Sequence, residues 1–479
     1  MFAIQSIHEW VDAPGELITW APAPTTLAKV QEAPVSPVPA SYQQDQHLRS
    51  YREHAARGTE MARLTIPAWN IPGRCDIRAM THVINAYLRR HDTYRSWFEF
   101  DENDRVVRRT MRSPRDIKFV PTRHGEQTSA EWREHVLATP SPLEWDCFRF
   151  GLIQREDHFT LYMSLDHLHI DGMFMGLAFV EIHMMYAVLV EGGAPIPLPQ
   201  AGSYDDYCLR QRRSTAALTL DSSQVRRWMT FAEGNNGSLP QFPLPLGDPS
   251  VPCEGDLLTV QMMDEEQTQR FESVCTDVGV RFIGGVFAVA ALAEYELTGA
   301  DTYYVISPTG TRTTPGDMLT TGWFTGTVPI TVPINAASFA DTARAAQRSF
   351  DSDIDLAHVP FDRVLELAGG RLRAPEPGVP MLSYLDATVP PLSPAIVCEW
   401  NGLKGKLYSE LGAANQIGMW VNRFGKGTSV TMAFPNNPIA RESAIRYLEA
   451  MRSVYVRVAE GRGESARVGD RANLDLNPA

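Results

Sequence analysis

The sequence contains little cysteine, and no two cysteines form a close pair. Its 479 residues include six cysteines. They are scattered along the chain at Cys75, Cys147, Cys208, Cys253, Cys275 and Cys398. A disulfide framework is dense and belongs to small secreted domains, so this pattern predicts reduced and mostly buried thiols. Zinc sites built from close cysteine pairs are also excluded.

Positive charge is in deficit as well. Lys and Arg number 44 against 57 Asp and Glu, which gives a net charge of −13. A nucleic-acid binder needs a cationic surface to displace counterions from phosphates, so nucleic acid is not expected as a partner. Adsorption to anionic lipid through a polybasic face is disfavoured for the same reason. The nucleotide motifs GxxxxGK[ST] and GxGxxG and the hydrolase motif GxSxG are missing too.

Signals for secretion or membrane insertion are weak. The first twenty residues have neither a basic segment nor an apolar core of signal-peptide length, so we expect a cytoplasmic protein. The longest apolar run, Met173 to Val190, is nearly long enough to span a bilayer. Glu181 and His183 lie in its middle, however, where a charge in hydrocarbon costs about 2.5 kcal/mol or more. A helix buried in a protein core is the better interpretation.

The hydrophobic pattern indicates alternating helices and strands. Apolar residues at helical spacing predict a helix over Ile77–Arg90 with Asp76 as N-cap, and alternation predicts a strand over His158–Leu165. Further helices are expected at 286–297 and 438–459, and strands at 302–307, 417–424 and 429–434. The length allows about three domains, but two α/β halves fit better. We therefore expect an N-terminal lobe over 1–200, a Pro-rich crossover over 201–250, a C-terminal lobe over 251–465 and a polar tail over 466–479.

The loop between the strand and the long apolar helix contains several residues that could take part in catalysis. It reads Asp166-His167-Leu168-His169-Ile170-Asp171-Gly172. A neutral imidazole at a strand end is suited to take a proton from a hydroxyl, which makes His167 a candidate general base. Asp171 could hold the loop, and Gly172 could allow a tight turn. His167 could equally be a core histidine, His169 is expected to serve packing, and a metal site from His167, His169 and Asp171 is less favoured.

Six blocks in order resemble the condensation-domain superfamily of acyltransferases, whose signature is HHxxxDG. DHLHIDG from Asp166 matches the signature. The other blocks begin at Ser41 (SYQQDQHLRSY), Arg90 (RHDTYRSWF), Tyr204 (YDDYCLRQ), Gly310 (GTRTTPGDMLTTGWFTGTVPITV) and His358 (HVPFDRVLEL). Stretches such as RRHDTYRSWFEF, FPLPLGDPS and FPNNPIARES are similar to the mycobacterial polyketide-associated acyltransferases, especially those that acylate trehalose.

The resemblance implies a fold of α/β (α+β) class. Two lobes like chloramphenicol acetyltransferase would form a V-shaped pseudo-dimer with a tunnel between them. His167, the second position of the signature, would be the base, and Asp171 would support the loop, commonly through an arginine. Arg312 is either that support or an entry residue. Two positions depart from the pattern: Asp166 replaces the first histidine, and Gly326 stands where peptide-forming relatives often have Asn.

The implied activity is transfer of a long-chain fatty or polyketide acyl group from a thioester to a hydroxyl of trehalose or a trehalose derivative. Trp323, Thr325, Gln416 and Trp420 are candidate acceptor contacts, although packing would also explain them. No cofactor is expected beyond the acyl-CoA or carrier-bound thioester, and no carrier segment of the Gly-Gly-x-Ser type is present.

Several alternatives stay open at this point. The acceptor could be a lipid diol or a hydroxylated polyketide, or the chain could be a non-catalytic docking module. A polyketide synthase or a lipid transporter could be a partner, and the inner face of the plasma membrane is a conceivable location. Because two fused lobes already form an interface, we expect a monomer.

Overall fold

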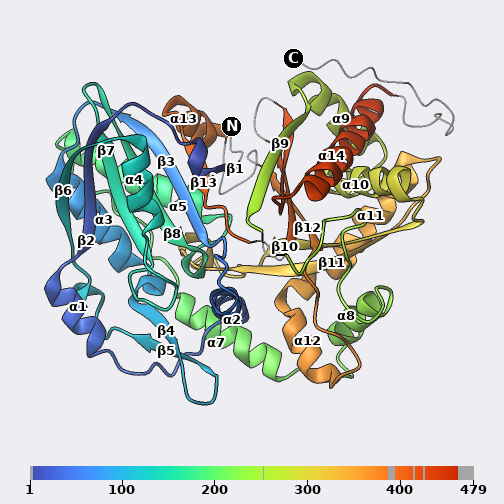
Figure 1. The fold of residues 1–479 in the computed structure, drawn as a ribbon, viewed down its shortest axis with the longest axis horizontal. Coiled ribbons are helices and arrows are strands. Elements are labelled where there is room, and N and C mark those ends of the chain that lie inside the picture. Colours follow the sequence, from blue (N-terminus) through green and yellow to red (C-terminus); the bar gives the residue numbers. More distant parts are fainter. Residues whose placement is uncertain (1–3, 252, 387–393, 414–415, 424–426, 462–479) are drawn as a thin grey trace.

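The protein consists of two lobes that lie side by side, each built on its own β-sheet (Figure 1). The description rests on a computed structural model and covers residues 4–251, 253–386, 394–413, 416–423 and 427–461. The expected tail over 466–479 lies outside these residues. The two separate sheets, one in each lobe, confirm the two-lobed α/β architecture predicted from the sequence.

The N-terminal lobe contains a sheet of seven strands in the order β1-β13-β3-β8-β7-β2-β6. β8 lies at the centre, where β3 and β7 pair with its two edges, and residues on both of its faces are buried. The bounds are β1 Ile4–Ser6, β2 Gly15–Pro22, β3 Leu64–Pro72, β6 Phe119–Gln127, β7 Phe148–Gln154, β8 His158–Asp166, α1 Pro24–Gln31, α2 Tyr42–Ala56, α3 Ile77–Arg90, α4 Ser129–Leu137, α5 Phe174–Phe179 and α6 Met185–Val190, with a separate hairpin of β4 Ser96–Phe100 and β5 Val106–Thr110.

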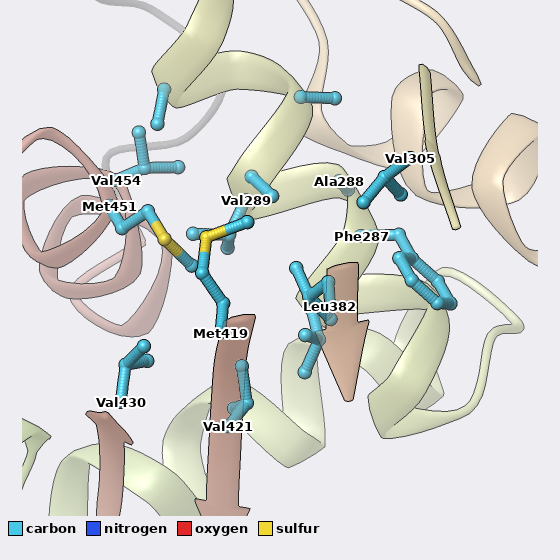
Figure 2. Packing of buried hydrophobic residues seen from close by; sticks show 14 of the residues in the cluster. Phe287, Ala288, Val289, Val305, Leu382, Met419, Val421, Val430, Met451 and Val454 are labelled. Carbon is cyan, nitrogen blue, oxygen red and sulfur yellow. The ribbon is translucent and has the colours of Figure 1, made fainter. Parts of the chain in front are cut away.

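The C-terminal lobe contains a sheet of six strands in the order β11-β10-β12-β14-β15-β9. α10 and α14 pack on one face, where Val289, Met451 and Val454 meet Met419 and Val421 of the sheet (Figure 2). The bounds are β9 Gly255–Met263, β10 Thr302–Gly310, β11 Thr325–Pro333, β12 Val379–Asp386, β14 Gln416–Arg423, β15 Thr428–Pro435, α8 Ser223–Glu233, α9 Glu265–Asp277, α10 Phe282–Thr298, α11 Phe339–Asp353, α12 Phe361–Ala368 and α14 Pro438–Ala459. α7, Tyr204–Ala216, runs between the lobes (Figure 1).

One segment of the second half of the chain joins the first lobe. β13, Lys406–Ser409, pairs antiparallel with β3 and parallel with β1. α13, Pro394–Gly402, precedes it and buries Val397 and Trp400 in the core of the N-terminal lobe. The expected C-terminal lobe of 251–465 therefore does not hold as one unit. Residues 394–409 lie in the N-terminal lobe, because β13 pairs with its sheet and α13 packs in its core.

Local patterns predicted the main elements well. α3 has the predicted bounds, and the Asp76 side chain accepts hydrogen bonds from the backbone of Arg78 and Ala79 as an N-cap does. The apolar run from Met173 is a helix with a π-helical turn at Val180–Met184; its residues 174–183 are mostly buried, whereas Met184 and Val190 are exposed. Among the described residues, no single helix has the length and hydropathy to cross a membrane; α9 and α10 pass that test only together, across a bend of 99°.

Candidate active site

His167 lies where β8 ends and the chain turns toward α5. The residues His167–His169 form one 3-10 turn, and Asp166 caps it by accepting a hydrogen bond from the Leu168 backbone at 3.0 Å. The backbone N–H of His167 donates to the Arg63 carbonyl at 2.9 Å. The start of β3 therefore fixes the backbone of His167 directly.

The carboxylate of Asp166 is completely buried and has a histidine and an arginine as partners. Nε2 of His47 lies 2.8 Å from Oδ1, and Nη1 of Arg63 lies 3.0 Å from Oδ2. Burial alone would raise the pKa of Asp166, but the charge and hydrogen bond of His47 and the charge of Arg63 outweigh burial and lower this pKa to about 2. Asp166 is therefore an ionised, hydrogen-bonded anchor.

Asp171 binds the segment between β10 and β11, which comes from the other lobe. Arg312 forms a buried ion pair with its carboxylate, in which Nη2 donates to Oδ1 at 3.2 Å and Nη1 donates to Oδ2. The backbone N–H groups of Met173 and Phe324 also donate to Asp171, each at 3.0 Å. The guanidinium of Arg312 stacks over the Phe324 ring at 4.3 Å. The support that the sequence left undecided is thus Arg312, acting between the lobes.

Aromatic rings surround the partly exposed side chain of His167. The ring centroid of Trp323 lies 4.1 Å from that of His167, and the centroid of His47 lies 6.4 Å from it. Burial, and next the charge of His47, lower the pKa of His167 to about 4, while its own backbone, Asp166 and Asp171 act in the opposite direction. Nδ1 is buried, so the accessible edge of the ring carries Nε2. The imidazole is neutral at pH 7 and able to accept a proton.

The other predicted acceptor contacts lie on strands of the C-terminal sheet. Thr325 is the first residue of β11, opposite Gly310. Trp420 lies on β14 beside Ser383 of β12, on the face opposite the core residues Met419 and Val421. Leu385 is on this same face, and its Cδ2 would lie 3.7 Å from a Cβ at Gly172. Trp420 therefore faces the N-terminal lobe. Gln416 begins β14, and its side chain lies outside the described residues.

Two glycines near the site differ in how much they depend on lacking a side chain. The φ of Gly172 lies outside the left-handed region, so the turn itself does not require glycine there. The chain does turn at Gly172 into α5, as expected, but another residue could adopt the same backbone conformation. At Gly326, by contrast, a Cβ would collide with the Ala357 carbonyl. The position where relatives often carry Asn is therefore closed by backbone, and no side chain can act there.

His169 points away from the reacting edge. Its Nδ1 lies 2.9 Å from the Thr93 hydroxyl and its Nε2 lies 3.3 Å from the Cys147 sulfur. Burial lowers its pKa to about 4. These contacts agree with the packing role predicted for His169. Across the described ranges, no cluster of three or more His, Cys, Asp or Glu side chains is arranged to hold a metal ion.

Sequence reasoning missed two residues that contact the loop, His47 and Arg63. His47 lies 119 positions before Asp166, and Arg63 lies 103 before it. The block from Ser41 drew attention to this helix, and the structure shows that Gln44 donates to the Leu168 carbonyl at 3.0 Å. His47 is one helical turn later on the same face. The only hint in the sequence was Asp166 itself, because a buried carboxylate requires a cation or a hydrogen-bond donor from another part of the chain.

Comparison with known proteins places the chain among described relatives. The family model "Condensation domain" matches residues 67–371. "Trehalose-2-sulfate acyltransferase PapA2" of Mycobacterium tuberculosis (strain ATCC 25618 / H37Rv) is 56% identical over 96% of this chain and 98% of the relative. "Acyltransferase PapA3" of the same strain is 52% identical over 95% and 97%. "2'-acyl-2-O-sulfo-trehalose (hydroxy)phthioceranyltransferase PapA1" of strain CDC 1551 / Oshkosh is 52% identical over 98% and 90%.

Solved structures agree with this placement. The structure titled "PapA2 acyl transferase" superposes with a TM-score of 0.93 at 56% identity, covering 96% of this chain and all of that chain. The first condensation domain of the calcium-dependent antibiotic synthetase superposes with a TM-score of 0.65 at 16% identity, covering 88% and 96%, and shares the fold. The chain therefore belongs to the condensation-domain family and, within it, to the Pap acyltransferases.

Proposed function

We propose that the protein transfers a long-chain fatty or polyketide acyl group from a thioester to a hydroxyl of trehalose or a trehalose derivative such as trehalose 2-sulfate, in the synthesis of a cell-envelope glycolipid. The observation that carries this proposal is the partly exposed, neutral ring of His167, which is held between the lobes of a chain 56% identical to a trehalose-2-sulfate acyltransferase.

In this proposal Nε2 of His167 removes the proton of the acceptor hydroxyl while its oxygen attacks the thioester carbonyl. The tetrahedral intermediate then collapses, the carbon–sulfur bond breaks, and the thiolate takes the proton from the His167 imidazolium. The products are an ester and a free thiol, and His167 is neutral again. A positioned general base of this kind contributes about 10²–10⁴-fold to the rate.

The remaining site residues divide into supports and contacts. Asp171, Arg312, Asp166 and Gly172 belong to the loop and its anchors, whereas Trp323 is placed to contact substrate, because its ring lies against His167. Thr325, Gln416 and Trp420 are proposed acceptor contacts at the junction of the lobes. The thioester donor, as acyl-CoA or on a carrier protein, and the acceptor would reach His167 through a passage between the lobes.

The supply and the removal of substrates involve other proteins in this proposal. The donor would come from a polyketide synthase or an acyl-CoA pool, and the product would pass to a lipid transporter. We place the reaction in the cytoplasm, at the inner face of the plasma membrane, where an amphiphilic product could leave.

A competition between acceptors tests the proposal. The purified protein is incubated with palmitoyl-CoA and an equimolar mixture of trehalose, trehalose 2-sulfate and a long-chain 1,2-diol, and the esters are identified by mass spectrometry. We expect acylated trehalose or acylated trehalose 2-sulfate to dominate. A diol ester as the main product would favour the lipid-diol alternative, and release of thiol without any ester would contradict acyl transfer to these acceptors.

A further inference from the structure

Helix α2 holds the turn that carries His167 at two points. Gln44 donates to the Leu168 carbonyl at 3.0 Å, and His47, one helical turn later, bonds Asp166 at 2.8 Å. The start of α2 is itself fixed, because Ser41 and Gln44 form a capping box and the Tyr204 hydroxyl donates to Oγ of Ser41 at 3.1 Å. A rigid helix therefore contacts both residues that flank His167.

The direction of the bond between His47 and Asp166 follows from the chemistry of the pair. Asp166 is buried, ionised and bound by Arg63 through its other oxygen, and an ionised carboxylate can only accept hydrogen bonds. Nε2 of His47 must therefore carry the proton in this bond. The His47 ring also stands edge-on to Trp323, with centroids 5.5 Å apart and the planes at 82°. His47 thus joins the anchor of the base to the aromatic neighbour of the base.

The acidic residues on either side of His167 each contact an arginine. Asp166 is matched by Arg63, and Asp171 is matched by Arg312. His169, on the same turn, faces Thr93 and Cys147 rather than the His167 ring. His47, which bonds Asp166, is the group whose charge most lowers the pKa of His167 after burial, and Glu410 lies beside the Arg63–Asp166 pair, where it accepts from the Arg63 backbone. A proton on His47 therefore opposes a second positive charge on His167.

We propose that His47 is a positioning residue for His167: it holds the carboxylate of Asp166, and with it the turn that aims the base. This inference rests on the proposed role of His167 as the base.

Substitution of His47 tests the proposal. In His47→Ala the bond to Asp166 is lost, and we expect kcat to fall by about 10²-fold with KM for both substrates nearly unchanged, the size that a misplaced catalytic group produces. In His47→Gln the side-chain N–H can still reach Asp166, and kcat should recover to within about tenfold of the native value, since the neutral hydrogen bond is weaker. The neighbouring exposed residue provides the control Gln46→Ala, which should act like the native enzyme.

A second readout does not depend on the acceptor. The rate at which diethyl pyrocarbonate modifies His167, followed by peptide mass spectrometry across pH, gives the titration midpoint of the ring. His47→Gln removes a like charge near His167, so the midpoint should rise, by up to about one pH unit. If the native enzyme acylates none of the tested acceptors but the midpoint rises, the proposed function fails and the positioning role stands.

Two results would overturn the proposal. One is a His47→Ala enzyme with native kcat and a native His167 midpoint. The other is a His47→Gln enzyme that loses as much kcat as His47→Ala and leaves the midpoint unmoved, since His47 would then matter only as a buried side chain of the fold.

Discussion

The two carboxylates on either side of His167 have matching partners that come from different parts of the chain. Asp166 and Asp171 each bind one arginine and at least one backbone N–H group. The partners of Asp166, His47 and Arg63, belong to its own lobe, whereas Arg312 comes from the opposite lobe. The first anchor therefore fixes His167 within its lobe, and the second also joins the two lobes around His167.

Arg312→Met should have the largest effect on stability. It leaves the buried carboxylate of Asp171 without its counter-charge and removes a contact between the lobes, so we expect the free energy of unfolding to fall by about 3–5 kcal/mol. Urea denaturation followed by tryptophan fluorescence measures this. The control is Arg281→Met, whose pair with Asp351 is exposed at 60% and 55% and should contribute about 0–1 kcal/mol. Equal losses in the two variants would contradict the importance given to the buried pair.

Arg63→Met should cost less than Arg312→Met. Asp166 keeps the His47 and Leu168 hydrogen bonds, so its charge stays partly compensated. We expect a loss of about 1–3 kcal/mol, in the range for hydrogen bonds to a charged group. The same denaturation experiment orders the two variants. If Arg63→Met were the more damaging, the anchor inside the lobe would be the principal one.

The pH dependence of activity tests whether Arg63 and Arg312 offset the effect of Asp166 and Asp171 on the pKa of His167. His167 acts in its neutral form, and its pKa is lowered by burial and by His47, so activity is lost only as pH falls through this lowered pKa. We expect kcat/KM to stay level between about pH 7.5 and pH 6, where an ordinary histidine of pKa about 6.5 would already lose half of its base form. A half-maximal rate at pH 6.5 or above would show that Asp166 and Asp171 act on the ring unscreened.

Gly172→Ala should have the smallest effect. The backbone there is not left-handed, and the new methyl group would meet Leu385 at an ordinary 3.7 Å, so the free energy of unfolding should change by less than about 1 kcal/mol. The comparison variant is Gly151→Ala, whose methyl group would collide with the Tyr162 ring and should cost about 1–3 kcal/mol. Thermal unfolding of both proteins distinguishes them, and a Gly172→Ala variant as unstable as Gly151→Ala would mean that the loop does need glycine.

The sequence predicts what depends on neighbouring residues. Helical spacing and a capping carboxylate are local, and α3 and α14 have the predicted bounds. The short strand β13 carries only Lys406–Ser409, and its pairing with β3 joins positions more than 330 residues apart. No local pattern contains that information, so the return of this segment to the first lobe could not be predicted.

The residues of the candidate site likewise divide into those that a local motif predicts and those that come from distant parts of the chain. The loop from Asp166 to Gly172 is contiguous and its motif was visible, and the resemblance extended this to Arg312 and Trp323. His47 was not predicted, because its contact with Asp166 depends on α2 packing against the turn that follows β8 and not on any spacing near the motif. Buried charges require partners, but a single sequence does not show which distant residue provides them.

The central claim, that His167 is the base of an acyl transfer, is tested most directly by His167→Ala, with the exposed His82→Ala as its control. Ester formation from palmitoyl-CoA and trehalose 2-sulfate is measured by mass spectrometry under identical conditions. We predict a loss of about 10²–10⁴-fold in His167→Ala and native activity in His82→Ala. Native ester formation by a folded His167→Ala protein would contradict the account.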